Sequence, residues 1–167
     1  SLYVQYNRVD RLPADLTADL ETAMADPAVA RIVLDLRHNF SGELSALDDM
    51  SPRLVKAAAA HGGGMIAISG RNTFSAGSLL VARLKAQSNT TLVGEPMGGC
   101  PTVYSDPETV DLPWSGLSIN IASDTAVGVD PDDPRLTIDP DVAAELSQQE
   151  WTDGEDPALA LVLPVAP

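Results

Sequence analysis

The sequence predicts one α/β domain with a mainly parallel sheet flanked by helices. Short apolar runs of strand length alternate with longer segments whose apolar residues recur at helical spacing, which is the order expected of such a sheet. The 167 residues are 44% hydrophobic and 20% charged, a composition that suits one compact core. We therefore expect a single domain over residues 1–167, and the abrupt start at Ser1 indicates that it belongs to a longer protein.

The first predicted elements are a strand, a helix and a second strand. Residues 2–6 are rich in β-prone side chains and are followed by polar residues, as expected of a short strand. Residues 16–24 carry apolar side chains at helical spacing, with Asp15 placed to cap this helix and Asp26 beside a proline to end it. Residues 32–36 form an apolar run typical of a buried parallel strand.

The middle of the chain contains the segment in which we first expect function. Helical periodicity extends over residues 44–60, where Pro52 predicts a break. Residues 65–68 form the next predicted strand, and an amphipathic helix follows a few residues later. Ser75 therefore lies on a turn between a strand and a helix.

The last part of the chain is predicted to contain a strand, an irregular loop, a hairpin and a helix. Residues 91–94 form the strand, and the glycine and proline content of residues 95–101 predicts a loop. Residues 110–112 and 117–121 are predicted to pair as a β-hairpin near the carboxyl-terminal third. Asp156, which precedes a proline, is predicted to begin a short terminal helix.

Charge and cysteine content exclude several classes of function. Ten Lys and Arg stand against 24 acidic residues, giving a formal net charge of −14, which disfavours nucleic-acid binding. Cys100 is the single cysteine, so the chain can form neither an internal disulfide nor a paired-cysteine metal site. We expect no metal and no cofactor. No apolar run reaches the roughly 20 residues of a membrane span.

A serine at a sharp strand-to-helix turn can act as a nucleophile. The turn exposes the Ser75 hydroxyl, and backbone N–H groups at the start of the following helix point toward a developing oxyanion. The alternative is that Ser75 or Thr73 only caps the helix, which is a common role of these residue types. The local sequence alone favours the capping role, and the rest of the chain must support the catalytic one.

Four motifs in one order resemble the tail-specific, or carboxyl-terminal processing, serine proteases. Residues 35–42, D-L-R-H-N-F-S-G, resemble the D-L-R-x-N-x-G-G turn of that family. Residues 73–77, T-F-S-A-G, resemble its S/T-x-S-A segment, and residues 94–99, G-E-P-M-G-G, resemble its G-E-x-T-x-G loop. Residues 136–142 match the end of its G-I-x-P-D-V element. The resemblance spans nearly the whole chain.

The resemblance implies a fold similar to that of the Clp protease and crotonase superfamily, with stacked β-β-α units. By matching position, Ser75 is the nucleophile, and the N–H groups of Ala76 and Ser41 are the oxyanion donors. The implied activity is a serine-type peptidase or related acyl hydrolase that acts through an acyl-enzyme. Its implied substrate is a peptide or protein, such as a carboxyl-terminal tail, and the resemblance favours a location outside the cytoplasm.

Two residues depart from the family pattern. Cys100 stands where the processing proteases carry a general-base lysine, and Ser41 stands where they usually have glycine. If that turn needs a positive φ, Ser41 is strained by about 1 kcal/mol or more. The loop around Cys100 is more similar to a branch without the lysine, which is similar to the repeats of interphotoreceptor retinoid-binding protein. The alternative function is therefore a catalytically silent module that binds a hydrophobic ligand or peptide.

Two other residues are candidates for the missing base. His38 borders the oxyanion turn, and histidine is the residue type whose ordinary pKa lies nearest neutral pH, although a single loop histidine is more often a surface or packing residue. Glu95 lies in the matching loop and can accept a proton or orient a base, or it can hydrogen-bond to loop amides. Asp35 and Arg37 are expected to form a structural ion pair, and Asn39 is expected to fix its turn through hydrogen bonds to the backbone.

Overall fold

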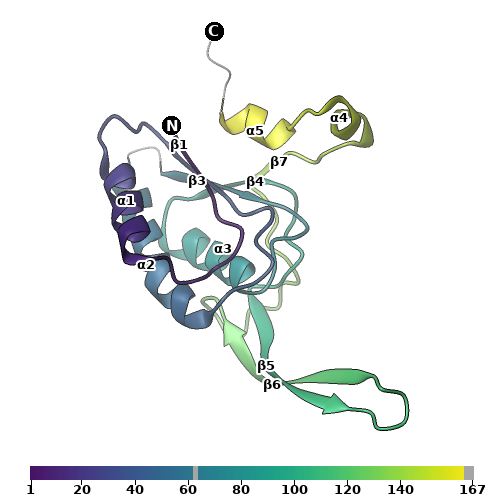
Figure 1. Ribbon diagram of the computed structural model, residues 1–167. Coiled ribbons are helices and arrows are strands. Elements are labelled where there is room, and N and C mark those ends of the chain that lie inside the picture. Colours follow the sequence, from purple (N-terminus) through teal and green to yellow (C-terminus); the bar gives the residue numbers. More distant parts are fainter. Residues whose placement is uncertain (62–63, 164–167) are drawn as a thin grey trace.

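The computed structural model describes residues 1–61 and 64–163, and its five parallel strands, flanked by helices, confirm the predicted α/β class (Figure 1). The strand order in the sheet is β1-β2-β3-β4-β7, and β5 and β6 form a separate antiparallel pair. The elements are β1 (Leu2–Gln5), α1 (Ala14–Ala25), β2 (Ile32–Asp35), α2 (Leu44–Ala60), β3 (Met65–Ser69), α3 (Ala76–Gln87), β4 (Thr91–Gly94), β5 (Thr102–Asp111), β6 (Ser118–Val127), β7 (Val142–Ala143), α4 (Gln148–Asp153) and α5 (Pro157–Val162).

The parallel sheet is covered on both faces. Successive side chains of a strand point to opposite faces, so Ile32 and Leu34 of β2 join one apolar cluster and Val33 joins another. The first and larger cluster contains the buried residues of α1, α2 and α3. The second contains Ala158 and Val162 of α5. This two-sided burial explains why the first three residues of β2, Ile32 to Leu34, are all apolar.

Helix α2 runs without interruption from Leu44 to Ala60, so the break predicted at Pro52 is wrong. An internal proline removes one backbone hydrogen bond and costs about 3 kcal/mol. The neighbouring side chains Leu47, Met50 and Leu54 are all buried in the core, and each contributes about 1.5–3 kcal/mol. Their burial outweighs the cost of the proline.

Helix α1 begins two residues earlier than a cap at Asp15 requires. Its first residue is Ala14, it follows Pro13, and no side chain caps it. Thr17 Oγ1 instead donates a hydrogen bond of 3.0 Å to the Pro13 carbonyl oxygen. The predicted capping role of Asp15 is therefore wrong, and its carboxylate lies in the first turn, where it complements the helix dipole.

Helix α3 is nearly all buried, although the sequence predicts an amphipathic helix. Every residue from Ala76 to Ala82 is buried, as is Leu84. The helix lies between α2 and the segment that follows β6, because Arg83 contacts Asp48 of α2 at 2.7 Å and the Gly128 carbonyl oxygen at 3.2 Å. Small and apolar residues are needed on several of its faces, which removes the one-sided pattern.

The predicted hairpin is present but much longer than its two apolar runs. Strands β5 and β6 pair antiparallel from Thr102 opposite Val127 to Asp111 opposite Ser118, and Figure 1 shows them extending away from the rest of the molecule. The halves near the body are rich in Ser, Thr and Asp, which hides them from a hydrophobic pattern. Within residues 1–61 and 64–163, no helix has the length and apolar character needed to cross a membrane.

Candidate active site at the start of helix α3

Ser75 occupies a strained backbone position immediately before α3. Its φ of 54° and ψ of −125° lie where residues other than glycine are rarely found, at a cost of about 1–3 kcal/mol. The side chain caps no helical N–H, and its hydroxyl forms no hydrogen bond with any residue that the structure describes. A capping role therefore does not account for Ser75.

Thr73 joins the turn before Ser75 to the turn after β2. Its buried hydroxyl donates 2.9 Å to the Leu36 carbonyl oxygen and accepts 3.0 Å from the Gly70 N–H. The Phe74 N–H donates 2.9 Å to the Asn39 carbonyl oxygen. These bonds hold the two turns together and fix the backbone on which Ser75 sits.

Asn39 lies wholly buried between the same two turns. Its Nδ2 donates 2.7 Å to the Tyr6 carbonyl oxygen, as expected of a residue that fixes its turn. Its Oδ1 has no partner among the described residues. A Cβ at Gly77 would lie 2.6 Å from the Asn39 carbonyl oxygen and 2.8 Å from its Oδ1, so the start of α3 can approach Asn39 only because residue 77 is glycine.

Ser41 lies in a turn that a short parallel bridge to Val9 holds in place. The Val9 N–H donates 3.0 Å to the Ser41 carbonyl oxygen, and the Glu43 N–H donates 2.7 Å to the Val9 carbonyl oxygen. Among the described residues only Ser75 and Asp106 are non-glycine residues with positive φ. The strain expected at Ser41 is therefore absent, because Ser41 does not adopt the left-handed backbone.

The N–H groups predicted to form an oxyanion hole have no acceptor of their own. Within the part of the chain that the structure describes, neither the Ser41 N–H nor the Ala76 N–H donates to a protein oxygen. Both belong to turns that the Asn39 and Phe74 backbones bind together. Neither amide is therefore committed to a hydrogen bond with a described residue, and Ala76 itself is only 1% exposed.

Arg37 and Asp35 form the predicted structural ion pair. Arg37 Nη2 lies 2.7 Å from Asp35 Oδ2, and its Nη1 lies 2.7 Å from Asp156 Oδ2. Tyr3 donates a further 2.7 Å hydrogen bond to Asp35. Burial alone would raise the pKa of Asp35, but the hydrogen bonds from Arg37 and Tyr3 outweigh it and lower that pKa. Burial, together with Asp35, raises the pKa of Tyr3 to about 12.

The two predicted base candidates line a cavity of about 720 Å³ at the carboxyl ends of β2, β3 and β4. His38 is exposed and forms no hydrogen bond with a described residue. Both carboxylate oxygens of Glu95 contact the Arg71 guanidinium at 3.2 Å. Ser75 does not line this cavity, and neither candidate hydrogen-bonds to its hydroxyl. The structure thus brings His38 and Glu95 to one cavity and places Ser75 on the adjoining turn.

Sequence reasoning missed the segment that closes this cavity. Trp151 of α4 lines it together with residues 154–158, and α4 lies in a stretch that was not assigned to any element. The signal was present, because Ser147 and Glu150 form a capping box in which each side chain accepts from the other residue's backbone N–H. The cavity wall could therefore have been predicted as a helix, but not its position.

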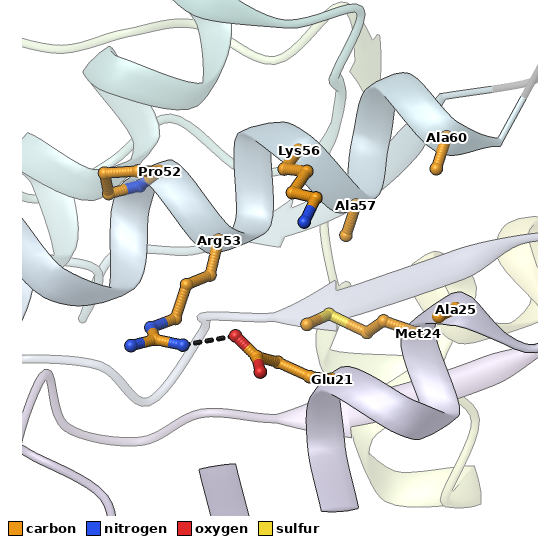
Figure 2. A pocket seen from close by; sticks show the side chains of 8 residues that line it. All are labelled: Glu21, Met24, Ala25, Pro52, Arg53, Lys56, Ala57 and Ala60. Atoms are coloured by element: carbon orange, nitrogen blue, oxygen red, sulfur yellow. Dashed lines mark hydrogen bonds and ion pairs between the residues drawn. The ribbon is translucent and has the colours of Figure 1, made fainter. Parts of the chain in front are cut away.

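A second hollow, of about 410 Å³, lies between α1 and α2 (Figure 2). Figure 2 shows Arg53 of α2 paired with Glu21 of α1, beside Met24. No serine, cysteine or histidine lines it, so it offers no nucleophile. Within residues 1–61 and 64–163, no group of three or more His, Cys, Asp or Glu side chains is arranged to hold a metal ion.

Several solved structures with a similar fold are described as peptidases or proteases. A candidate peptidase from Parabacteroides merdae matches with a TM-score of 0.72 and 18% identity, over 98% of this chain and 61% of that chain. A candidate S41 protease from Bacteroides fragilis matches with a TM-score of 0.59 and 15% identity, over 99% and 55%. The photosystem II D1 carboxyl-terminal processing protease matches with a TM-score of 0.52 and 20% identity, over 86% and 42%.

These comparisons define the class of fold. No family model and no curated protein matches the sequence. The chain has a peptidase-like α/β fold similar to that of the S41 proteases. It spans about six tenths of the length of the first of these solved chains and a little over half of the second.

Proposed function

We propose that this chain is the core of a serine-type acyl hydrolase, a peptidase by preference, in which Ser75 is the nucleophile. One observation carries the proposal: Ser75 is held at φ 54° before α3 with its hydroxyl unbonded to any described residue. Backbone strain persists only where surrounding contacts impose it, and such positions cluster at functional sites. A nucleophilic serine on a strained strand-to-helix turn is a recurrent arrangement of this kind.

The proposed reaction is an acyl transfer in two stages. Ser75 Oγ attacks the substrate carbonyl carbon while its proton passes to a base, and the carbonyl oxygen becomes an oxyanion that accepts hydrogen bonds from the Ala76 and Ser41 N–H groups. The C–N bond then breaks, and the amine leaves with the proton from the base. Water hydrolyses the resulting ester and restores the serine. The amino-terminal end of α3 adds a partial positive charge near the oxyanion.

The identity of the base is the open element of this mechanism. The Arg71 contacts of Glu95 favour a role in bracing its loop over a role as base, whereas His38 has no described partner that occupies its ring. The resemblance to a branch without the general-base lysine agrees with Cys100 at that position. If His38 is the base, His38→Ala lowers the acylation rate of Ser75 by about 10²-fold or more, and Glu95→Gln leaves it within a few-fold.

An active-site-directed fluorophosphonate tests the proposal directly. Wild-type protein is expected to be labelled, Ser75→Ala to remain unlabelled, and Ser45→Ala, which alters an exposed serine of α2, to be labelled like the wild type. Intact mass spectrometry counts the adduct, and circular dichroism checks that each variant is folded. Folded wild-type protein that takes no label, or label that persists in Ser75→Ala, contradicts the proposal.

A binding module without catalysis is the second candidate, and one observation favours it. A cavity of about 180 Å³ lies beneath α1 and is lined mainly by apolar side chains, among them Leu20, Leu34 and Leu54. A cavity of about 150 Å³ with such walls binds benzene or xenon in another protein. If the fluorophosphonate does not react and benzene raises the melting temperature, the binding function replaces the enzymatic one.

A further inference from the structure

The outer half of the β5–β6 hairpin has one apolar and one polar face. We call residues 102–127 the arm. Val110 lies opposite Ile119, and Glu108 lies opposite Ile121, so these four side chains share one face. Apolar residues of this face and of the tip are exposed to 44% (Val110), 45% (Ile119), 55% (Ile121), 64% (Leu117) and 99% (Trp114).

The opposite face of the arm is already satisfied by its own polar side chains. Thr109 Oγ1 donates 2.8 Å to Asn120 Oδ1, and Ser118 Oγ donates 2.6 Å to Asp111 Oδ1. These cross-strand bonds connect residues that the register places directly opposite each other. The face of the arm that lacks such cross-strand bonds is therefore the apolar one.

The arm also has two open edges. Its sheet contains only β5 and β6 among the described strands, so each strand presents a row of backbone N–H and C=O groups to solvent. A two-stranded hairpin alone is marginally stable in water, and a third strand or a packed layer is what stabilises it. Open edges are also the usual site at which an extended segment of another chain adds a strand.

Charge selects the kind of segment that can bind. The arm contains Asp106, Glu108, Asp111 and Asp124 but no lysine or arginine, and none of these four acids forms an ion pair with a described residue. A second copy of the chain would bring the same four charges and a net charge of −14. Electrostatic complementarity therefore favours a basic partner over a second copy.

From these observations we infer that the arm binds an extended, basic segment of a partner protein by strand addition. Backbone hydrogen bonds pair the segment with an arm edge, and its apolar side chains extend the face around Ile119. Its lysine or arginine side chains lie on the other face, where they approach Asp111 and Asp124. The inference does not depend on Ser75, because it concerns binding and needs no reaction.

Trp114 provides the measurement. The chain has two tryptophans, so Trp151→Phe leaves Trp114 as the single emitter on the full chain. A peptide of about eight residues with alternating lysine and valine is expected to shift the Trp114 emission to shorter wavelength, and one with alternating glutamate and valine is not. Raising the ionic strength from about 0.1 M to about 1 M shortens the Debye length from about 10 Å to about 3 Å and weakens this binding several-fold.

A matched pair of variants assigns the face. Ile119→Thr with Ile121→Thr keeps β-branched residues on β6 but removes apolar surface, and it is expected to weaken binding by about tenfold or more. Asn120→Thr with Ala122→Thr alters the opposite face of the same strand and is expected to leave affinity within about twofold. Circular dichroism checks that both double variants remain folded.

Three results overturn the inference. The first is equal binding of the basic and acidic peptides, and the second is binding of the basic peptide that survives the change at Ile119 and Ile121. The third is wild-type protein that sediments as a dimer and becomes monomeric in that double variant, which assigns the arm to a second copy. Failure of the fluorophosphonate to label Ser75 leaves all three readouts unaffected.

Discussion

The pattern Asp-x-Arg occurs twice, at Asp35–Arg37 and at Asp133–Arg135, with nearly the same hydrogen bonds. In each, Nη2 of the arginine donates to Oδ2 of the aspartate, at 2.7 Å in the first and 2.6 Å in the second. In each, the arginine backbone N–H also donates to Oδ1, at 3.0 Å and 3.1 Å. The side chain of Arg37 is 24% exposed, whereas that of Arg135 is 57% exposed.

The geometry of an ion pair alone therefore does not set its contribution to the free energy of unfolding. Asp35 is withdrawn from water, and it receives hydrogen bonds from both Tyr3 and Arg37. In the second pair the Arg135 side chain is 57% exposed, although that of Asp133 is only 11% exposed. Water therefore still solvates the guanidinium, and the contribution of such a pair is expected to be small. The same Asp-x-Arg pattern thus stabilises the sheet edge beside the candidate site, whereas at Asp133–Arg135 it fixes only the conformation of a loop.

The largest expected effect comes from removing the buried partner. Arg37→Met leaves the Asp35 carboxylate buried without its counter-charge, so the free energy of unfolding is expected to fall by about 3 kcal/mol. Arg135→Met breaks the equivalent surface pair and is expected to leave the urea midpoint unchanged within error. Urea denaturation followed by circular dichroism measures both, and equal shifts in the two variants would show that burial does not matter here.

The pH dependence of stability provides a second test of the buried Asp35–Arg37 pair. The pKa of Asp35 in the folded protein is below its ordinary value, because hydrogen bonds from Arg37 and Tyr3 outweigh burial. The stabilisation is complete above the unfolded pKa of about 3.9 and is lost as pH falls through the lower folded pKa. Arg37→Met removes the guanidinium hydrogen bonds but keeps the Tyr3 hydroxyl and the residue 37 backbone N–H as donors to Asp35. The pKa of Asp35 is therefore expected to rise relative to the wild type, and the loss of stability on acidification is expected to shrink. Urea midpoints between acidic and neutral pH test whether the variant loses less stability than the wild type at acidic pH.

Two glycines, Gly77 and Gly116, differ in the space that surrounds the position of a Cβ. Gly77→Ala would place a Cβ 2.6 Å from the Asn39 carbonyl oxygen, and overpacking of this kind is expected to cost about 2 kcal/mol. Gly116, at the tip of the arm, has φ +68° and nothing within 4 Å of the position of a Cβ, so Gly116→Ala is expected to cost about 1 kcal/mol or less through φ alone. Thermal denaturation measures both variants, and a lower midpoint for Gly116→Ala than for Gly77→Ala would contradict this expectation.

The smallest effect concerns the two non-glycine residues with positive φ, Ser75 and Asp106. Ser75→Gly relieves strain and is expected to raise the free energy of unfolding by about 1 kcal/mol while it abolishes fluorophosphonate labelling. Asp106→Gly gains less, because aspartate adopts this backbone more readily and the arm can relax. A Ser75→Gly protein that is less stable than wild type would show that the position is not strained.

Much of the fold follows from local patterns. Apolar runs placed β1 to β4 within a residue or two, because these strands are short and β2 to β4 are nearly completely buried. The break predicted at Pro52 and the cap predicted at Asp15 failed where tertiary burial or a neighbouring proline overrides a local preference. Strand β7 could not be predicted, because two residues paired with β4 carry no periodicity.

The candidate site was only partly accessible to sequence reasoning. The position of Ser75 before a helix follows from the chain order, and the contact of its turn with the Asn39 turn fits the expectation that parallel strands end at one edge. The separation of Glu95 from Ser75 does not follow, because it depends on the direction of a side chain and on Arg71, a residue with no distinguishing pattern. Long-range contacts of this kind are set by packing, which a single sequence does not reveal.

The base of the arm is closed by a single backbone bond from the Gly128 N–H to the Pro101 carbonyl oxygen, at 2.9 Å. The strands beyond it pair mainly with each other, so amide exchange in the arm is expected to proceed by local opening rather than by unfolding of the sheet. A short turn grafted between Tyr104 and Thr125 keeps Val103 and Ala126 packed against the core and should therefore leave the five-stranded sheet intact. The length of the outer arm is thus independent of the packing that holds Ser75 in place.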